Sequence, residues 1–188
     1  MTEFKVKDYG QRTTFETGSQ KEIVSGRGRF DLLPLKTLAG LFATDTETSR
    51  ILESLHYALV NENIDIKIGH LCDAISAFLE FEPAYRGTMY SWIQDLAKLY
   101  EAGANKYAAR DWEKGRPMEI FINSALRHYF KFKNSEYDER HDLAFLWNII
   151  GLIDTLRRMP SMAYTLKETV DPPSKLAETL NSVKKIME

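Results

Sequence analysis

The sequence predicts an all-α protein. After residue 45, apolar residues recur three and four positions apart, as they do along the buried face of a helix. One stretch, 139–157, is apolar almost all the way round, which is typical of a helix buried at the centre of a bundle. No stretch alternates clearly enough to predict a strand. We therefore expect a helical bundle.

Composition and motifs exclude several classes of protein. The 188 residues suffice for one packed domain with an inserted subdomain, and a net charge of −2 argues against general nucleic-acid binding. No apolar run predicts a signal peptide or a membrane span, so we expect a cytoplasmic protein. The single cysteine, Cys72, lies in an apolar helical stretch and is predicted to be a small core residue. No Walker sequence, zinc-type His/Cys cluster, nucleophile elbow or dinucleotide fingerprint is present.

The first half of the chain predicts an arm followed by a helical hairpin. Residues 1–44 are polar and rich in glycine, threonine and basic residues, which predicts an irregular N-terminal arm and lead-in. Residues 45–88 predict two helices, of which the first follows the capping sequence Thr44–Thr48 and the second stops before Pro83. Their apolar faces predict that they pack against each other.

The second half predicts the bundle core. Within residues 89–158 the periodicity predicts helices over 89–107, 118–132 and 139–157. In the first of them Trp92, Ile93, Leu96, Leu99 and Tyr100 are predicted to face inward. Residues 159–188 predict a C-terminal extension that ends in an amphipathic helix.

The acidic run Asp138-Glu-Arg-His-Asp142 is the strongest chemical signal. Glu139 and Asp142 are three positions apart, so on a helix they share one face and can bind one hard divalent cation. Mg²⁺ prefers such oxygen ligands and bridges them to substrate phosphates. The alternative is structural: Asp138 caps the helix, and Glu139 and Asp142 interact with the positive end of its dipole. Spacing alone leaves both interpretations open.

Other polar residues have both a functional and a structural interpretation. His128 lies on the preceding helix, where a hairpin brings it near the acidic run as a ligand or leaves it as a core histidine. Asn148 lies within the apolar helix, so its amide is a core anchor or a substrate contact. The loop 107–115 mixes aromatic, cationic and glycine residues, as either a nucleotide-binding lid or an ordinary exposed loop does. Arg27 and Arg29 offer guanidinium groups that suit phosphate.

A series of motifs resembles one known family. They are Thr17-Gly18, Gly28-Arg-Phe-Asp-Leu-Leu-Pro34, Tyr100-Glu-Ala-Gly-Ala-Asn-Lys-Tyr107, Arg110-Asp-Trp-Glu-Lys-Gly115, Ser124-Ala-Leu-Arg-His128 and Trp147-Asn148. In this order they resemble the dATP/dGTP diphosphohydrolase N-terminal domain family, which is found largely in bacteriophages. That family is similar to the MazG-like and dUTPase-like all-α nucleotide pyrophosphohydrolases. The resemblance covers about 15–34 and 90–156, so residues 45–88 look like a helical insertion.

The resemblance implies a MazG-like helical bundle, usually a homodimer or higher homo-oligomer, that holds Mg²⁺ on acidic helices. Two patterns carry the metal in such enzymes, Glu-Glu-x-x-Glu on one helix and Glu-x-x-Asp on the next. Glu139-Arg-His-Asp142 fits the second pattern. The first is absent, because the preceding helix offers Glu119, Asn123 and His128 instead.

The implied activity is the metal-dependent conversion of a deoxynucleoside triphosphate, dATP or dGTP, to its monophosphate and pyrophosphate. Mg²⁺, or Mn²⁺ in its place, would be held by His128, Glu139 and Asp142. The expected catalytic carboxylates are Glu101, Asp138, Glu139 and Asp142. The expected substrate contacts are Arg27, Arg29, Lys106, Lys114 and Arg127 for phosphate, Tyr107 and Trp112 for the base, and Asn148.

Two other functions stay open. One is a non-catalytic MazG-like phage module that binds a nucleotide or a host protein, which the missing Glu-Glu-x-x-Glu pattern favours. The other is a structural adaptor without a ligand, which the polar and aromatic residues named above disfavour. A phage-encoded chain would act in the host cytoplasm.

Overall fold

The structure is a computed structural model that describes residues 12–22, 26–81 and 91–163, and it confirms the all-α class. The described helices are α1 (Leu35–Leu41), α2 (Thr46–Val60), α3 (Ile64–Phe81), α4 (Ser91–Lys106), α5 (Met118–Lys133) and α6 (His141–Arg158). Short 3-10 turns are η1 (Phe30–Leu32), η3 (Asp111–Lys114) and η4 (Pro160–Met162). The strands β1 (Arg12–Thr14) and β2 (Gln20–Glu22) form one antiparallel hairpin.

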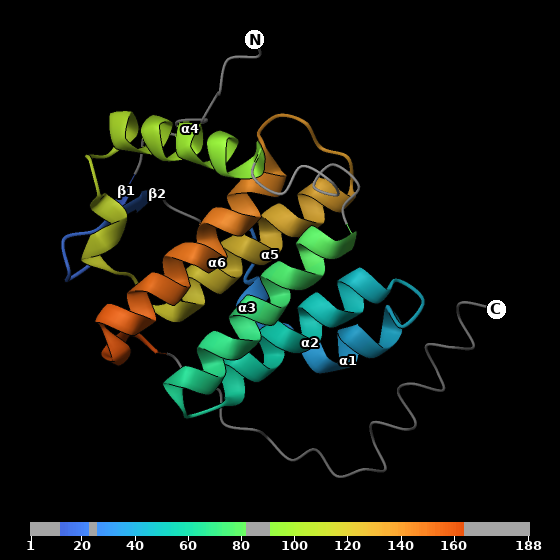
Figure 1. The fold of residues 1–188 in the computed structure, drawn as a ribbon. Helices are drawn as coiled ribbons and strands as arrows, with labels where there is room; N and C mark the ends of the chain where they lie inside the picture. Colours follow the sequence, from blue (N-terminus) through green and yellow to red (C-terminus); the bar gives the residue numbers. More distant parts are fainter. Residues whose placement is uncertain (1–11, 23–25, 82–90, 164–188) are drawn as a thin grey trace.

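Helix α6 is the central element, as its apolar sequence predicted. It packs against α5, α3 and α4, and Figure 1 shows α3, α5 and α6 running alongside one another. Six of its apolar side chains are completely buried: Leu143, Phe145, Leu146, Ile149, Leu152 and Leu156. Each such burial contributes about 1.5–3 kcal/mol of hydrophobic free energy. This helix therefore provides a rigid wall on which a site can be built.

Helices α2 and α3 form the predicted hairpin and share the core of α5 and α6. Asp45 caps α2, because its side chain accepts a hydrogen bond from the Thr48 amide at 3.1 Å. Lys67 is buried and donates to the carbonyls of Ala58 and Leu59 at the end of α2, which the apolar pattern did not predict. The ring of Phe78 on α3 lies 4.9 Å from that of Phe145 on α6, so the hairpin contacts the bundle directly.

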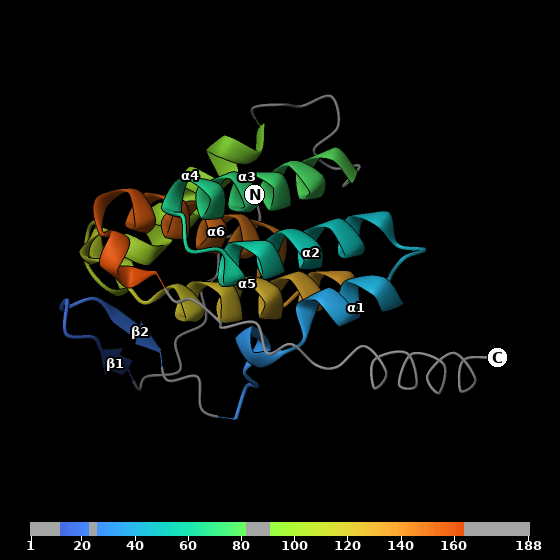
Figure 2. The same cartoon turned by 90° about the horizontal axis from the view of Figure 1, so that it is seen from below.

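The N-terminal segment is more regular than predicted. In place of an irregular arm, β1 and β2 pair with Thr13 opposite Lys21, and α1 buries Leu35 and Ala39. The hairpin lies on the α5 side of the bundle, away from α3 (Figure 2). Three-residue strands are too short to show an alternating pattern, and their placement depends on contacts with residues about one hundred positions later. Local sequence therefore could not reveal them.

Several detailed predictions were wrong. Helix α6 begins at His141 rather than at residue 139. Ile93 is 47% exposed instead of facing inward. Cys72 is exposed, because Leu71 and Ala74 occupy the inner face of α3. The amphipathic helix predicted near the C-terminus lies outside the described residues, and none of the helices within those residues is long and apolar enough to cross a membrane.

Candidate functional site

A cavity of about 190 Å³ lies where β2, α4, η3, α5 and α6 meet. The α5 side chains that line it are Ser124, Arg127, His128 and Lys131, whose spacing of three and four residues places them on one helical face. From α6 come Ala144, Trp147 and Asn148, which share a face for the same reason. The spacing that places apolar side chains of α5 and α6 in the core therefore also places these other side chains together on the face that lines the cavity.

The structure brings eight predicted site residues to this cavity: Arg27, Lys106, Tyr107, Trp112, Arg127, His128, Glu139 and Asn148. Five others do not line it: Arg29, Glu101, Lys114, Asp138 and Asp142. Arg29 instead donates to Asp31 at 2.7 Å, Lys114 pairs with Asp111 at 3.0 Å, and Glu101 is exposed on α4.

Cations outnumber carboxylates in the lining by eight to three. The cations are Lys21, Arg27, Lys106, Arg110, Arg116, Arg127, Lys131 and Arg140, and the carboxylates are Glu22, Asp111 and Glu139. No sequence pattern pointed to five of these cations: Lys21, Arg110, Arg116, Lys131 and Arg140. Basic side chains gathered around a cavity attract polyanions. The cavity is therefore suited to a polyphosphate.

Arg116 and Asp111 fix the hairpin against the cavity. Arg116 is 3% exposed and donates to Ser19 Oγ at 2.7 Å, to the Gln20 carbonyl at 2.7 Å and to Asp111 Oδ2 at 3.1 Å. The same Asp111 carboxylate accepts from the Gln20 amide at 3.0 Å. Burial opposes ionisation of Asp111, but these bonds and one from Lys114 outweigh it and lower its pKa. The pair thus joins two chain segments about 90 residues apart.

Lys21 extends from β2 to α5. Its Nζ donates to Ser124 Oγ and, at 3.3 Å, to the Ile120 carbonyl. Burial, followed by the nearby charges of Arg116 and Arg127, lowers the pKa of this ammonium well below its ordinary value. Lys106 on α4 pairs with Glu22 on β2, so β2 is bound to α4 as well as to α5.

Aromatic rings also line the cavity. The Tyr100 ring centroid lies 5.6 Å from that of Trp112 and 5.9 Å from that of Trp147. Arg116 lies 5.7 Å from the centre of the Trp147 ring. Burial and the charge of Asp154 raise the pKa of Tyr100 to about 12, so its hydroxyl stays protonated at neutral pH. Such a surface is suited to a planar, apolar group such as a nucleobase.

Asn148 presents a buried acceptor. Its Nδ2 donates to the Ala144 carbonyl at 2.7 Å, which fixes the orientation of the amide. Its Oδ1 is buried without a hydrogen-bond partner among the described residues, although Asn148 lines the cavity and is 3% exposed. A buried acceptor left unsatisfied costs about 1–3 kcal/mol, so a ligand donor at this position would recover free energy.

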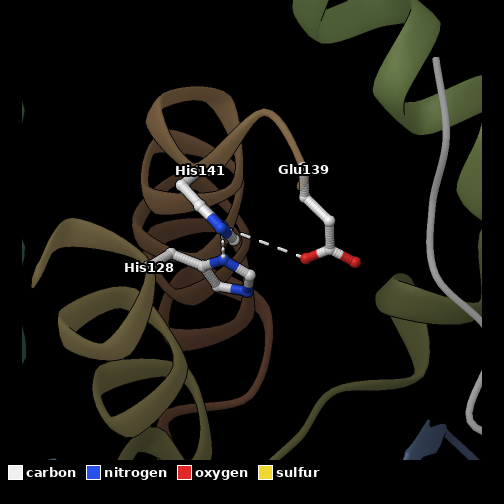
Figure 3. A group of neighbouring side chains, drawn as sticks. All are labelled: His128, Glu139 and His141. Carbon is white, nitrogen blue, oxygen red and sulfur yellow. Dashed lines mark hydrogen bonds and ion pairs between the residues drawn. The ribbon is translucent and has the colours of Figure 1, made fainter. Parts of the chain in front are cut away.

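A cluster of two histidines and a carboxylate lies at one end of the cavity (Figure 3). His128 Nδ1 lies 2.9 Å from His141 Nδ1, and Glu139 Oε2 lies 3.9 Å from that same His141 atom. His141 Nε2 contacts Asp138 Oδ1 at 2.7 Å. Burial is the main cause that lowers the pKa of His128, with the charge of Arg127 second, so this ring is neutral at physiological pH.

The expected pairing of Glu139 with Asp142 on one helical face does not occur. Glu139 precedes α6, whose N-terminal cap is Arg140, so the two carboxylates are not one turn apart on a helix. The Arg140 guanidinium instead contacts both oxygens of Asp142, with Nη2 to Oδ2 at 2.7 Å and Nε to Oδ1 at 3.0 Å. Asp138 does not cap the helix either, because its carboxylate contacts the ring of His141.

Magnesium does not fit the side chains that meet here. The three donor atoms that converge are two imidazole nitrogens and one carboxylate oxygen. Mg²⁺ prefers oxygen ligands in octahedral geometry, whereas imidazole suits zinc and related transition metals. At this end of the cavity, the donor set therefore differs from the oxygen-rich one that the resemblance implied.

Comparison with known proteins gives one match. Residues 82–165, less than half of the chain, match the family described as dATP/dGTP diphosphohydrolase, N-terminal. The matched segment contains α4, α5 and α6, which supply most of the cavity lining. No curated protein and no solved structure matches the chain. The segment that builds the cavity is thus similar to the dATP/dGTP diphosphohydrolase N-terminal family, which confirms the resemblance predicted from its motifs.

Proposed function

We propose that this chain hydrolyses a purine deoxynucleoside triphosphate, dATP or dGTP, to the monophosphate and pyrophosphate. The observation that carries the proposal is that one cavity is lined both by a group of aromatic rings and by basic side chains that outnumber the carboxylates. A nucleotide combines the two matching parts, a planar base and a polyphosphate. The name of the matching family, which describes a hydrolase of dATP and dGTP, supports the same conclusion.

The aromatic rings would bind the base, and the basic side chains would bind the phosphates. Tyr100, Trp112 and Trp147 offer ring surface on which a purine can stack. Lys106, Arg127 and Arg27 line the cavity and would contact phosphate oxygens. Their fixed charges would also stabilise the charge that develops during the reaction.

The reaction requires water to attack the α-phosphorus. The new bond joins the water oxygen to phosphorus, the bond from the α-phosphorus to the bridging oxygen breaks, and pyrophosphate leaves. A proton of the water must pass to a base, and His128, Glu139 and His141 are groups of the cavity end that can accept it. Dependence on a divalent metal ion is part of the proposal and is tested with it.

The test is an assay of pyrophosphate and monophosphate release from the four canonical dNTPs, with Mg²⁺, with Mn²⁺, with Zn²⁺ or Co²⁺, and with EDTA. The diagnostic variant is Lys106→Gln, and the matched control on the same helix is Lys98→Gln. Lys98 is exposed, pairs with Asp95 three residues away and does not line the cavity. We expect Lys106→Gln to lower kcat/KM by about tenfold or more, as the loss of a charged hydrogen bond does, with Lys98→Gln unchanged. Equal turnover by both variants would contradict the proposed phosphate site.

One observation favours a second function, a module that binds nucleotide without hydrolysing it. Two of the three lining carboxylates form ion pairs, Glu22 with Lys106 and Asp111 with Arg116. Few lining carboxylates are then available to bind a metal ion or to accept a proton from water. In that case a dNTP would raise the melting temperature while no product forms. The same protein preparations distinguish the two functions.

A further inference from the structure

The structure points to a transition-metal site: we infer that His128, Glu139 and His141 bind one borderline divalent ion of the zinc class, with Asp138 positioning the ring of His141. The ligand atoms of the first three lie within 4.8 Å of one another. Figure 3 shows the two rings and the carboxylate facing one another. The inference deepens the proposed function, since the ion would lie in the same cavity, and it is tested without nucleotide.

The spacing of the ligand atoms is close to what such an ion requires. Metal–nitrogen and metal–oxygen bonds of about 2.0–2.1 Å at a tetrahedral centre place neighbouring ligand atoms about 3.3 Å apart. The two Nδ1 atoms lie 2.9 Å apart, and Glu139 Oε2 lies 3.9 Å from His141 Nδ1. All three ligand atoms lie within 4.8 Å of one another, so side-chain adjustments of about 1.5 Å or less would complete the set. Two histidines and a glutamate also leave a fourth position for water or a phosphate oxygen, as catalytic zinc sites do.

Asp138 supports the assignment from the outer side of the ring. A histidine that binds a metal through one nitrogen commonly donates from the other to a carboxylate, which fixes the tautomer and the ring orientation. His141 has this arrangement, because its Nε2 contacts Asp138 Oδ1 at 2.7 Å while its Nδ1 faces His128 and Glu139. The Nδ1 atom of His141 is then an acceptor with its lone pair directed into the cluster.

In the metal-free protein, a proton between His128 Nδ1 and His141 Nδ1 joins the two rings by a hydrogen bond. His141 Nδ1 is an acceptor, so the short contact requires His128 Nδ1 to carry a proton and donate it. The Arg127 guanidinium, 3.2 Å from His128 Nε2, favours the same tautomer. Metal binding must move that proton from Nδ1 or release it, so it competes with protonation.

A second possible cluster shares His141 but fits less well. Glu136, Asp138 and His141 also bring ligand atoms together, with both carboxylates exposed. Lys131 pairs with both acids, at 2.9 Å from Glu136 and 3.8 Å from Asp138. Of the two sets, only the first includes residues that line the cavity, namely His128 and Glu139. With an ion bound, the three groups of the first set would hold the metal instead of accepting the proton of the water. The ion would then activate the water itself, because zinc lowers the pKa of its bound water to about 7.

The experiment uses the full chain without an affinity tag and in a Cys72→Ser background, because the exposed thiol of Cys72 can itself bind soft metals. Cobalt(II) alone is the optical probe, and zinc is titrated by calorimetry. The test variants are Glu139→Gln, whose side chain is partly exposed, and Asp138→Asn. The controls are His70→Gln, a histidine on α3, and Glu136→Gln, which affects only the second cluster.

We expect one equivalent of cobalt to give visible absorption typical of a low-coordinate site, with Mg²⁺ unable to displace it. Glu139→Gln should weaken binding by at least about tenfold and Asp138→Asn by about 10- to 100-fold, while His70→Gln leaves it unchanged. Absence of cobalt absorption would overturn the inference, as would binding that Glu136→Gln weakens and Glu139→Gln does not. Metal binding without turnover of any dNTP would support the metal site and contradict the proposed hydrolase activity. Turnover without metal binding at this cluster would support the hydrolase activity and contradict the metal site.

Discussion

The carboxylate of Asp111 and the guanidinium of Arg116 meet at 3.1 Å in the interior, and both also bind the β-hairpin through Ser19 and Gln20. This contact holds β2, and with it Lys21 and Glu22, against the helices that line the cavity. The cavity therefore depends on an ion pair that itself belongs to its wall.

The first prediction concerns this ion pair. Asp111→Asn should lower the free energy of unfolding by about 3 kcal/mol, because Arg116 keeps its buried charge without a carboxylate partner. Its neighbour Glu113 pairs with Arg110, whose side chain is 77% exposed, so Glu113→Gln should cost less than about 1 kcal/mol. Urea unfolding of the two variants beside wild type measures both values. An equal loss of unfolding free energy in the two variants would mean that the buried pair does not hold the hairpin in place.

The second prediction is the pH dependence of the same interaction. The pKa of Asp111 is lowered below 3.8 in the folded protein, so its unfolded state binds the proton first as the pH falls. Its stabilisation is thus fully present above that ordinary value and is lost as the pH falls through the folded pKa. The difference in unfolding free energy between wild type and Asp111→Asn should be constant from neutral pH to about pH 5 and shrink below 3.8. A difference that already shrinks near neutral pH would show that another group is responsible.

Local sequence was sufficient where one element determines its own structure. The nearly all-round apolar sequence of α6 predicted a central buried helix, and the run Thr44–Thr48 predicted the cap that Asp45 supplies. It failed where a contact joins distant segments, as for Lys21 with Ser124 and Arg116 with Ser19, which are 103 and 97 positions apart. No local pattern marks such residues, because their environment is created only when the hairpin docks.

The acidic run shows a different limit. Its residues were recognised, but the helix was predicted to begin two residues early, at Glu139 instead of His141. That shift placed Glu139 and Asp142 on one face and left His141 without a role. In the structure Arg140 binds Asp142, and His141 contacts both Asp138 and His128. Which side chains near the start of α6 can bind a metal ion together thus depends on the residue at which the helix begins. Apolar periodicity does not define that residue.

The third prediction separates stability from binding at Asn148. Asn148→Leu removes a buried acceptor that lacks a partner among the described residues, so the melting temperature without nucleotide should stay the same or rise. The same change should weaken dNTP binding severalfold, because the cavity loses an acceptor. Thr155→Val is the matched control, since Thr155 Oγ1 is also buried without a described partner but does not line the cavity. If both variants bind dNTP as wild type does, Asn148 is only a core residue.

The fourth prediction uses Arg127, which lies next to a proposed metal ligand and also lines the proposed nucleotide cavity. Its Nη2 is 3.2 Å from His128 Nε2, and its side chain lines the cavity. Arg127→Gln should tighten cobalt binding severalfold, because a positive charge no longer opposes the dication and His128 can carry its proton on Nε2. It should at the same time weaken binding of a triphosphate, which loses a cationic partner. Arg157→Gln removes the same charge from the exposed end of α6 and should change neither affinity. Cobalt titration and calorimetry with a dNTP measure the two affinities separately. If both affinities change in the same direction, Arg127 acts on the fold of the cavity and not on its ligands.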